Sequence, residues 1–250
     1  WTVITSLGSE GSTTGTDLQG MNGGLTGNYV LGSNIDASDT SSWNDGAGFD
    51  PIGEFGGDEF KGNFDGLGHI VSNLTINRPS EDNIGLFGYV YTETISKTIS
   101  NIGIVDNSFI GKNNVGGLIG MSLGSYNEDS SIEYSYIKNS YSTGNVSGEN
   151  NVGGLVGRGE NTLLKNSYAL GNVSGESYVG GLVGYYSNSD ITNAYSTGEV
   201  KGDNKVGGLA GYANSYSNIT NSFWDIDTSK QTTSDGGIGI YSSTENSINA

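Results

Sequence analysis

A six-residue sequence that recurs at a fixed interval is the feature that most limits the folds open to this chain. Val-Gly-Gly-Leu, a small apolar residue and Gly occur three times between residues 152 and 211, and Leu155, Leu182 and Leu209 lie 27 residues apart. A fixed period of this size is typical of solenoids, in which one unit cannot bury its own apolar face and must stack on its neighbours. We therefore predict one elongated body rather than two globular domains.

Two further patterns separate the copies of this hexapeptide. In the first, apolar, Asn and aromatic residues alternate with small or polar ones, as in Ile137, Asn139 and Tyr141; the second reads Gly-x-Val-x-Gly, as in residues 144–148. Alternation with a period of two indicates a strand with one face turned inward. Three short extended pieces and three corners per unit predict an all-β, three-sided parallel β-helix of about nine coils, each rising about 4.8 Å.

Residues at equivalent positions of such coils lie directly above one another, so the sequence predicts continuous columns. The three leucines should form an inward column. Period-two alternation also places Tyr141, Tyr168 and Tyr195 inside. A third column consists of asparagines whose amides should bond to one another or to nearby backbone, as buried polar groups must: Asn139, Asn166, Asn193 and Asn221.

The regularity of the repeat varies along the chain. We interpret the sequence as a single solenoid domain over 1–250, and four regions divide it: an N-terminal cap region at 1–27, irregular coils at 28–110, regular coils at 111–224, and a terminal coil or cap at 225–250. A capping-box sequence that begins at Thr16 predicts a short helix over residues 17–22.

Two segments exceed the period. Residues 37–58 form a long polar excursion, which we expect to be either a functional loop or an ordered decoration. Leu118 and Leu155 are 37 residues apart, ten more than the later interval, so a bulge is expected near residues 122–131.

Composition narrows the classes of partner. The chain has 10 basic and 27 acidic residues, a net charge of −17, 43 glycines, 2 prolines and no cysteine. Such a charge disfavours nucleic acid and anionic membranes, and the lack of Cys excludes disulfides and thiolate metal sites. No run of 18 apolar residues and no leader is present, which indicates either a mature chain or an excised segment. The lack of Cys fits a secreted bacterial protein.

Several sequences together resemble a known family. These are the four Val-Gly-Gly-Leu-x-Gly copies, the first at residues 115–120, and the segments at 28–38, 64–79 and 222–225. They resemble the GLUG-repeat segments of large secreted bacterial adhesins of the filamentous haemagglutinin-like type.

The resemblance implies a right-handed parallel β-helix, export to the bacterial cell surface or medium, and a place in a longer fibre. It implies no chemistry, because GLUG segments share no catalytic motif. The Asn-Pro-Asn motifs of the family's secretion domain are also missing, so the chain is similar to the shaft.

Acidic residues and the single histidine are the candidates for chemistry. Asp225 and Asp227 are a close pair beside an aromatic residue, where a cation such as Ca²⁺ or a sugar hydroxyl could be held; solvated cap residues are the simpler interpretation. His69 is expected to be a corner residue. Two neighbouring pairs are expected to be turn acids: Glu81 with Asp82, and Glu128 with Asp129.

Exposed tyrosines are the candidates for carbohydrate contact, and four follow the hexapeptides: Tyr185, Tyr186, Tyr212 and Tyr216. Ice binding is disfavoured because no regular Thr-x-Thr column occurs.

We predict no catalytic, cofactor-binding or metal residue, and Ca²⁺ is the one cation left open. The predicted function is a non-enzymatic structural and adhesive segment of a secreted surface protein, with carbohydrate or a cell-surface receptor as partner. Two alternatives stay open: a self-assembling extracellular filament subunit, and a carbohydrate-active β-helix enzyme.

Overall fold

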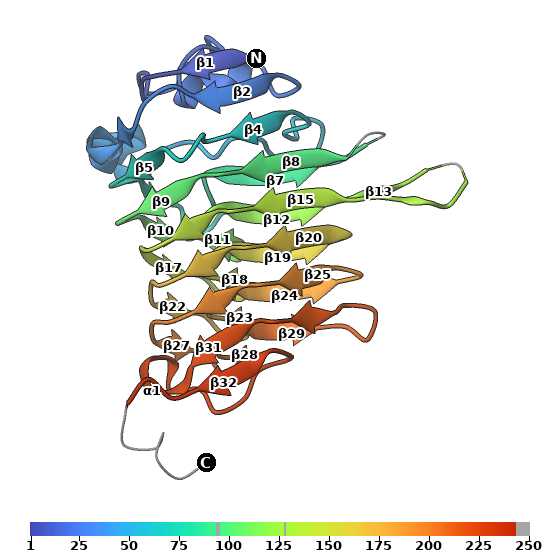
Figure 1. Cartoon of the computed structure of the whole chain (residues 1–250). Helices are drawn as coiled ribbons and strands as arrows, with labels where there is room; N and C mark the ends of the chain where they lie inside the picture. The colour runs from blue at the N-terminus through green and yellow to red at the C-terminus, as the bar shows by residue number, and fades with distance from the viewer. Residues whose placement is uncertain (94–95, 128, 244–250) are drawn as a thin grey trace.

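The computed structural model describes residues 1–93, 96–127 and 129–243. The chain winds into a parallel β-helix whose coils stack from the N-terminus to the C-terminus (Figure 1). This confirms the predicted fold class. No helix among the described residues is long and apolar enough to cross a membrane.

Two eight-stranded parallel sheets run along the whole stack. Sheet A contains, in spatial order, β1 (Thr2–Ile4), β2 (Asn28–Leu31), β4 (Asn63–Asp65), β8 (Lys97–Ser100), β15 (Ser135–Lys138), β20 (Thr162–Lys165), β25 (Asp190–Thr192) and β30 (Ile219–Thr220). Sheet B contains β3 (Ile35–Asp36), β5 (Ile70–Ser72), β9 (Gly103–Val105), β16 (Tyr141–Ser142), β21 (Tyr168–Ala169), β26 (Tyr195–Ser196), β31 (Phe223–Asp225) and β32 (Ile238–Ile240).

Three shorter parallel sheets complete the later coils. Sheet C contains β6 (Thr75–Asn77), β10 (Ser108–Ile110), β17 (Asn145–Ser147), β22 (Val173–Ser174) and β27 (Val200–Lys201). Sheet D contains β7 (Phe87–Tyr91), β12 (Ile119–Leu123), β19 (Val156–Glu160), β24 (Val183–Ser187) and β29 (Ala210–Ala213). Sheet E contains β11 (Asn113–Gly116), β18 (Asn150–Gly153), β23 (Ser177–Gly180) and β28 (Asn204–Gly207).

A regular coil therefore has five short strands rather than the three extended pieces expected. Two extra corners account for the difference. One lies inside the hexapeptide, where β18 ends at Gly153 and β19 begins at Val156, and the other lies at Asn139, between β15 and β16. The 27-residue period itself holds, since Val152 pairs with Val179 and Val179 with Val206.

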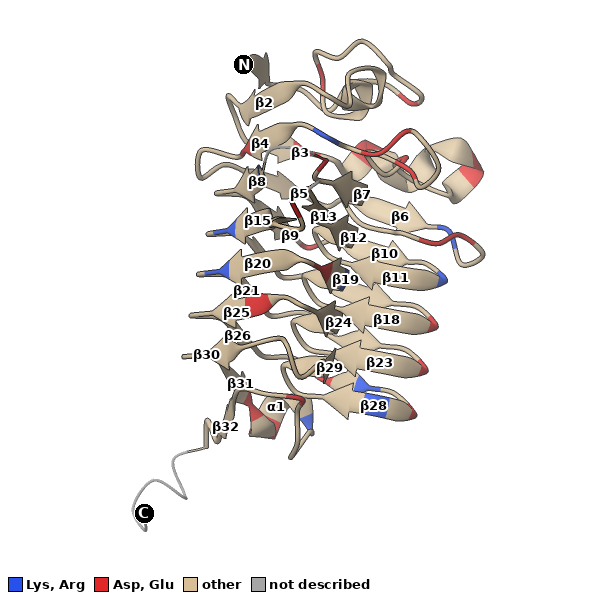
Figure 2. Cartoon of the chain, turned by 90° about the vertical axis from the view of Figure 1, so that its right-hand side faces the viewer, with Lys and Arg blue, Asp and Glu red and all other residues tan. Residues whose placement is uncertain are grey.

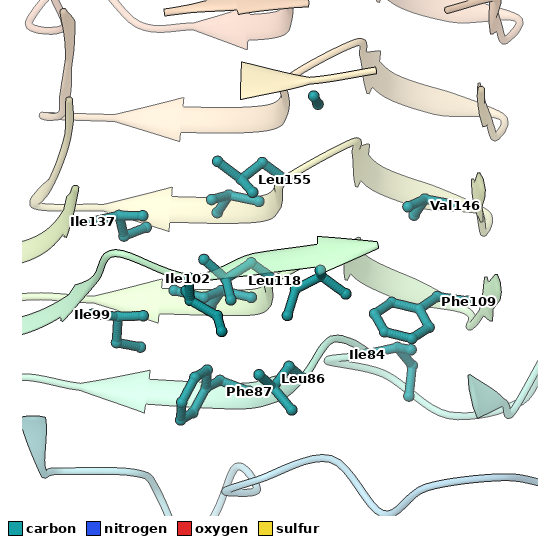
Figure 3. Packing of buried hydrophobic residues seen from close by; sticks show 14 of the residues in the cluster. Ile84, Leu86, Phe87, Ile99, Ile102, Phe109, Leu118, Ile137, Val146 and Leu155 are labelled. Atoms are coloured by element: carbon teal, nitrogen blue, oxygen red, sulfur yellow. The ribbon is translucent and has the colours of Figure 1, made fainter. Parts of the chain in front are cut away.

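The leucine column forms as predicted. The Leu155 N–H donates to the Leu182 carbonyl and the Leu182 N–H to the Leu209 carbonyl, each over 2.9 Å. All three side chains are fully buried. Figure 3 shows Leu118 and Leu155 in the same core, with Ile137 and Val146 reaching it from sheets A and C.

The second glycine of the hexapeptide has a packing reason. A Cβ on Gly154 would lie 2.7 Å from the Ala169 Cβ and 2.3 Å from the Gly181 carbonyl oxygen. A Cβ on Gly181 would likewise lie 3.0 Å from the Ser196 Cβ. Small inward residues of sheet B thus abut a backbone without side chains, which keeps this side of the coil thin.

The tyrosine column exists, but the prediction that it faces inward is wrong. Tyr141 and Tyr168 are half-buried and Tyr195 is 41% exposed, whereas the next residue in each strand is buried. The cause is Asn139, whose φ of 51° is in the left-handed region. This corner shifts the alternation by one residue, so that Ser140 rather than Asn139 follows Ile137 into the core.

The asparagine ladder is confirmed as a set of hydrogen bonds, but it lies on the outside. The Asn139 amide donates to Asn101 over 2.9 Å, Asn166 to Asn139 over 3.1 Å, and Asn193 to Asn166 over 3.1 Å. Asn221 donates to Asn193 over 3.4 Å. Each of these residues has a positive φ, which Asn tolerates better than most residues, so the ladder marks a corner and not the core.

The first coil differs from the helical cap expected at residues 17–22. A short 3-10 helix is present at η1 (Gln19–Gly23). The Asp17 carboxylate, and not Thr16, accepts a hydrogen bond from the Gly20 N–H of this helix over 2.7 Å. The strand β1 precedes it and extends sheet A, so residues before 28 already belong to the stack.

The excursion at residues 37–58 is packed onto the first coils. It contains η2 (Ser38–Ser42) and η3 (Asn44–Gly46), and its Phe49 and Ile52 are fully buried. Arg78 holds the excursion through its ion pair with Asp50, and a second ion pair, over 3.1 Å, joins Arg78 to Glu81 in the turn that follows β6. The segment is an ordered part of the stack.

The surplus near residues 122–131 forms the predicted bulge. The strands β13 (Ser125–Tyr126) and β14 (Ile132–Glu133) pair antiparallel, and Figure 1 shows them projecting from the side of the stack.

The last coil is covered by the chain that follows it. After α1 (Ile226–Ser229), the Thr233 carbonyl accepts from the Gly208 N–H over 3.0 Å, and the Gln231 amide donates to the Val200 carbonyl over 2.8 Å. β32 pairs with β31. The chain after α1 therefore covers β27 at the end of sheet C and the Gly208 backbone that follows β28, while β32 itself becomes the last strand of sheet B.

Candidate functional site

The acidic pair at the last coil has a structural role. The Asp225 carboxylate accepts from the Asp227 N–H over 2.9 Å and caps α1. Burial acts to raise the pKa of Asp225, but hydrogen bonds from Ser242, Thr228 and the Asp227 N–H together lower it. Hydrogen bonds from Ser243 lower the pKa of Asp227. The two carboxylates do not lie on one face of a strand, because β31 ends at Asp225 and α1 begins at Ile226.

The remaining acidic candidates and His69 also lie at corners. Glu81 pairs with Arg78, and Asp82 accepts from the Asn113 side chain over 2.8 Å. The His69 Nδ1 lies 3.0 Å from the Asn34 Oδ1, in a turn before β5. Asp129 accepts from the Ser131 hydroxyl over 2.6 Å, while its neighbour Glu128 lies outside the described residues.

No group of three or more His, Cys, Asp and Glu side chains among the described residues is arranged to hold a metal ion. Acidic residues do form a column at the corner before sheet E. The backbone N–H of each donates to the carbonyl of the equivalent residue in the preceding coil: Glu149, Glu176 and Asp203. Figure 2 shows acidic residues repeating along that corner. Like charges stacked at this spacing repel one another and account for part of the net charge.

Three of the four candidate tyrosines lie at the surface. Tyr185 and Tyr212 stack on sheet D with ring centroids 5.0 Å apart, and Tyr216 is 78% exposed. Tyr186 is fully buried, because it follows Tyr185 in the same strand and points to the other face; burial raises the pKa of its hydroxyl.

The rings on sheet D are already occupied by neighbours. Tyr178 packs edge-on against Tyr185 at 5.7 Å and Tyr212 at 5.9 Å. The Arg158 guanidinium lies 5.2 Å from the Tyr185 ring, and the Lys205 ammonium 5.7 Å from the Tyr212 ring. These contacts link the coils and leave little ring surface for a ligand.

A second aromatic surface, on sheet B, was missed by the sequence reasoning because its tyrosines were assigned to the core. Tyr141, Tyr168 and Tyr195 stack with centroids 4.7 and 4.8 Å apart and nearly parallel rings. In the preceding coil, Gly103 occupies the position equivalent to Tyr141, so the column of rings stops there and a hollow of about 440 Å³ opens beside it. The signal in the sequence is a glycine where later coils have an aromatic residue.

Comparisons with known proteins agree with this architecture. Residues 148–174 and 175–201 each match the family model of the GLUG motif. A stretch of 139 residues, 53% of the chain, is 38% identical to Halomucin from Haloquadratum walsbyi, of which it covers 1%. The chain thus carries GLUG repeats and spans a small fraction of this much longer relative.

A solved structure shares the fold. The crystal structure of a candidate immunoglobulin A1 protease from Bacteroides ovatus superimposes with a TM-score of 0.54 over 90% of this chain and 81% of that one. Since the two sequences are 19% identical, the likeness concerns the fold alone.

Proposed function

We propose that this chain is a non-enzymatic structural segment of a secreted cell-surface protein, a stiff stalk that holds contact surfaces away from the cell. The observation that carries the proposal is the unbroken stack. One hydrophobic cluster extends from Ile4 to Trp224, and sheets A and B each continue through eight strands. Inner strands with partners on both sides give a body that resists bending and proteolysis.

The relatives support this setting. GLUG repeats recur in the regular coils, and the name Halomucin denotes a mucin-like protein, which favours an extracellular location. A net charge of −17 disfavours nucleic acid and anionic membranes as partners. Carbohydrate or a cell-surface receptor is the partner that we favour for the adhesive part of this role.

The two alternatives have less support. Stacking further copies directly on β27 and β31 would require the segment after α1 to leave the strands that it covers. The carbohydrate-active enzyme has the fold alone in its favour, since the Bacteroides neighbour is named a protease and is 19% identical. Asp225, the strongest acidic candidate, is engaged in capping a helix.

Antibody labelling of intact cells tests the location. An antibody raised against the folded segment should label cells without permeabilisation, and external protease should remove other surface proteins before this segment. Labelling that requires permeabilisation would contradict the proposal. Purified segment incubated with polysaccharides and with immunoglobulin A1 should release no product; turnover that Asp225→Asn abolishes would support the enzyme instead.

A further inference from the structure

The aromatic column of sheet B ends at Tyr141, which has a stacked ring on one side only. Tyr168 stacks on Tyr141 from the following coil at 4.7 Å, with 7° between the ring planes. The opposite face of Tyr141 is therefore turned toward the preceding coil, where Gly103 has no side chain. A Cβ on Gly103 would lie 2.4 Å from the Tyr141 Cζ, so glycine is required for the ring to lie as it does.

The hollow beneath this ring has a defined floor and wall. It is lined by Leu67 and Gly68 from the turn before β5, by Ile102 and Gly103 at the start of β9, and by the amides of Asn101 and Asn139 beside Tyr141. Its volume of about 440 Å³ lies within the range of about 300–1,000 Å³ usual for small-molecule sites. Leu67 is 58% exposed and presents an unpartnered apolar surface.

The amides of the hollow keep hydrogen-bonding capacity. Asn139 donates to Asn101 over 2.9 Å, and Asn101 donates to Asp65 over 2.8 Å. An amide has two N–H donors and two oxygen lone pairs, so the ladder leaves Asn139 a donor and an acceptor for a ligand. Because both asparagines are held by the ladder, little side-chain entropy is lost on binding.

The chemistry of the lining selects a class of ligand. None of its seven residues is charged, and the net charge of the chain is −17. Anionic ligands would therefore be repelled without an ion pair to hold them. A pyranose ring has a face of C–H groups that packs on an aromatic ring and hydroxyl groups at its rim that both donate and accept hydrogen bonds.

The geometry points to this hollow, bounded by Tyr141, Leu67 and Asn139, as a binding site for an uncharged sugar residue of a glycan. The sugar face packs between the Tyr141 ring and Leu67, and its hydroxyls pair with the amides of Asn101 and Asn139. This inference rests on the proposed extracellular role for its setting and names the class of ligand that the stalk contacts.

Binding to a panel of uncharged oligosaccharides of two to six hexose units tests the site, with sulfated oligosaccharides as the comparison. Tyr141→Ala removes the aromatic wall. Leu67→Asn removes the apolar floor and suits a backbone whose φ is 52°, so it should leave the fold intact. Tyr195→Ala is the matched control, an exposed member of the same column outside the hollow.

At least one uncharged oligosaccharide is expected to bind, and both hollow variants should weaken that binding about tenfold while the control retains it. No binding across the panel, equal binding by all variants, or preference for sulfated sugars would overturn the site. Loss of binding in a Tyr212→Ala variant alone would assign the ligand to sheet D instead. Surface labelling of intact cells reports on the stalk separately, so failure of the site leaves that proposal standing.

Discussion

The irregular coils at residues 28–110 and the regular coils at 111–224 fill the same kind of core with different side chains. Among the residues that the structure describes, buried phenylalanines occur only in the first region, where the ring centroids of Phe60 and Phe64 lie 4.9 and 5.3 Å from that of Phe87. There Phe64 pairs with Ile99 35 residues later. In the second region Leu164 pairs with Ile191 after 27 residues.

The difference shows two ways of closing a coil. Where the interval varies, bulky rings fill the space inside coils that carry additional chain. Where the interval is constant, small residues of sheet B meet glycines of the hexapeptide, and the packing can be repeated without change. Irregular coils should therefore depend on ring volume, and regular coils on the absence of a Cβ.

The largest effect is expected from the ring volume of the irregular coils. Phe87→Ala should lower the free energy of unfolding by about 3–5 kcal/mol, because it leaves a cavity between Phe60 and Phe64. Denaturant unfolding measures the change. Phe55→Ala is the control, since Phe55 is 73% exposed, and should change stability little. Equal effects from both substitutions would contradict the packing argument.

In the regular coils, Gly181→Ala should cost about 3 kcal/mol. The new Cβ would lie 2.2 Å from the Gly208 carbonyl oxygen, a backbone atom that cannot move without disturbing the next coil. Gly175→Ala is the matched control, because its nearest neighbours are methyl groups of Val152 and Val179. Thermal unfolding of the two variants should separate them; a larger loss in Gly175→Ala would argue against the close approach of the backbones.

The ion pairs of Arg78 should affect only the first region. Arg78→Met leaves Asp50 without its charged partner and should cost about 2 kcal/mol, the typical value of hydrogen bonds to charged groups. Hydrogen exchange should accelerate at residues 37–58 and stay unchanged at 150–200. Acceleration throughout the stack would mean that the excursion is not a separate unit of stability.

Acid should loosen the cover of the regular coils. The pKa of Asp225 is lowered in the folded chain from its ordinary value of 3.8, so its contribution is present above that pH and is lost as the pH falls through the folded value. Asp225→Ala should cost about 1 kcal/mol near neutral pH, the usual value of a helix cap, and should flatten the acid dependence of stability. Unfolding measured between pH 5 and 2 checks this, and an unaltered pH profile would assign the acid sensitivity to other carboxylates.

The smallest effects concern the left-handed corners. Asn193 has a φ of 54°, so Asn193→Ala should lower the free energy of unfolding by about 1 kcal/mol. Asn193→Gly should lower it by less, because Gly keeps the backbone conformation and removes only the side-chain amide. Lys205 also has a φ of 54°, and Lys205→Asn should raise the free energy of unfolding by about 0.5 kcal/mol. Chemical unfolding resolves both; equal losses for Asn193→Ala and Asn193→Gly would place the stabilisation in the amide ladder instead.

The stack could be predicted from the sequence because the residues that repeat with the 27-residue period are apolar and must face the core. Leu155 and its equivalents are apolar and lie in the core, and their constant spacing sets the register in which successive coils pair. The tyrosine column could not be oriented in the same way, because the φ of Asn139 shifts the alternation and no residue in the strand reports that angle.

The candidate site depended even more on spatial arrangement. Leu67 and Tyr141 belong to different coils. They border one hollow only because the turn before β5 lies beside Gly103 on the side of the preceding coil. Of the tyrosines chosen from the sequence, Tyr186 is buried and Tyr185 is covered by Arg158. Position after the hexapeptide identifies the strand, but it does not specify what lies on each ring.

The hairpin of β13 and β14 has a consequence for engineering. Residues on either side of it keep their register, since β12 and β15 pair with β19 and β20 as they would in a shorter coil. Residues inserted in this hairpin therefore do not change the strand pairing of the coils. A foreign epitope inserted between Tyr126 and Ile132 would be displayed on a rigid support, at a fixed height along the rod.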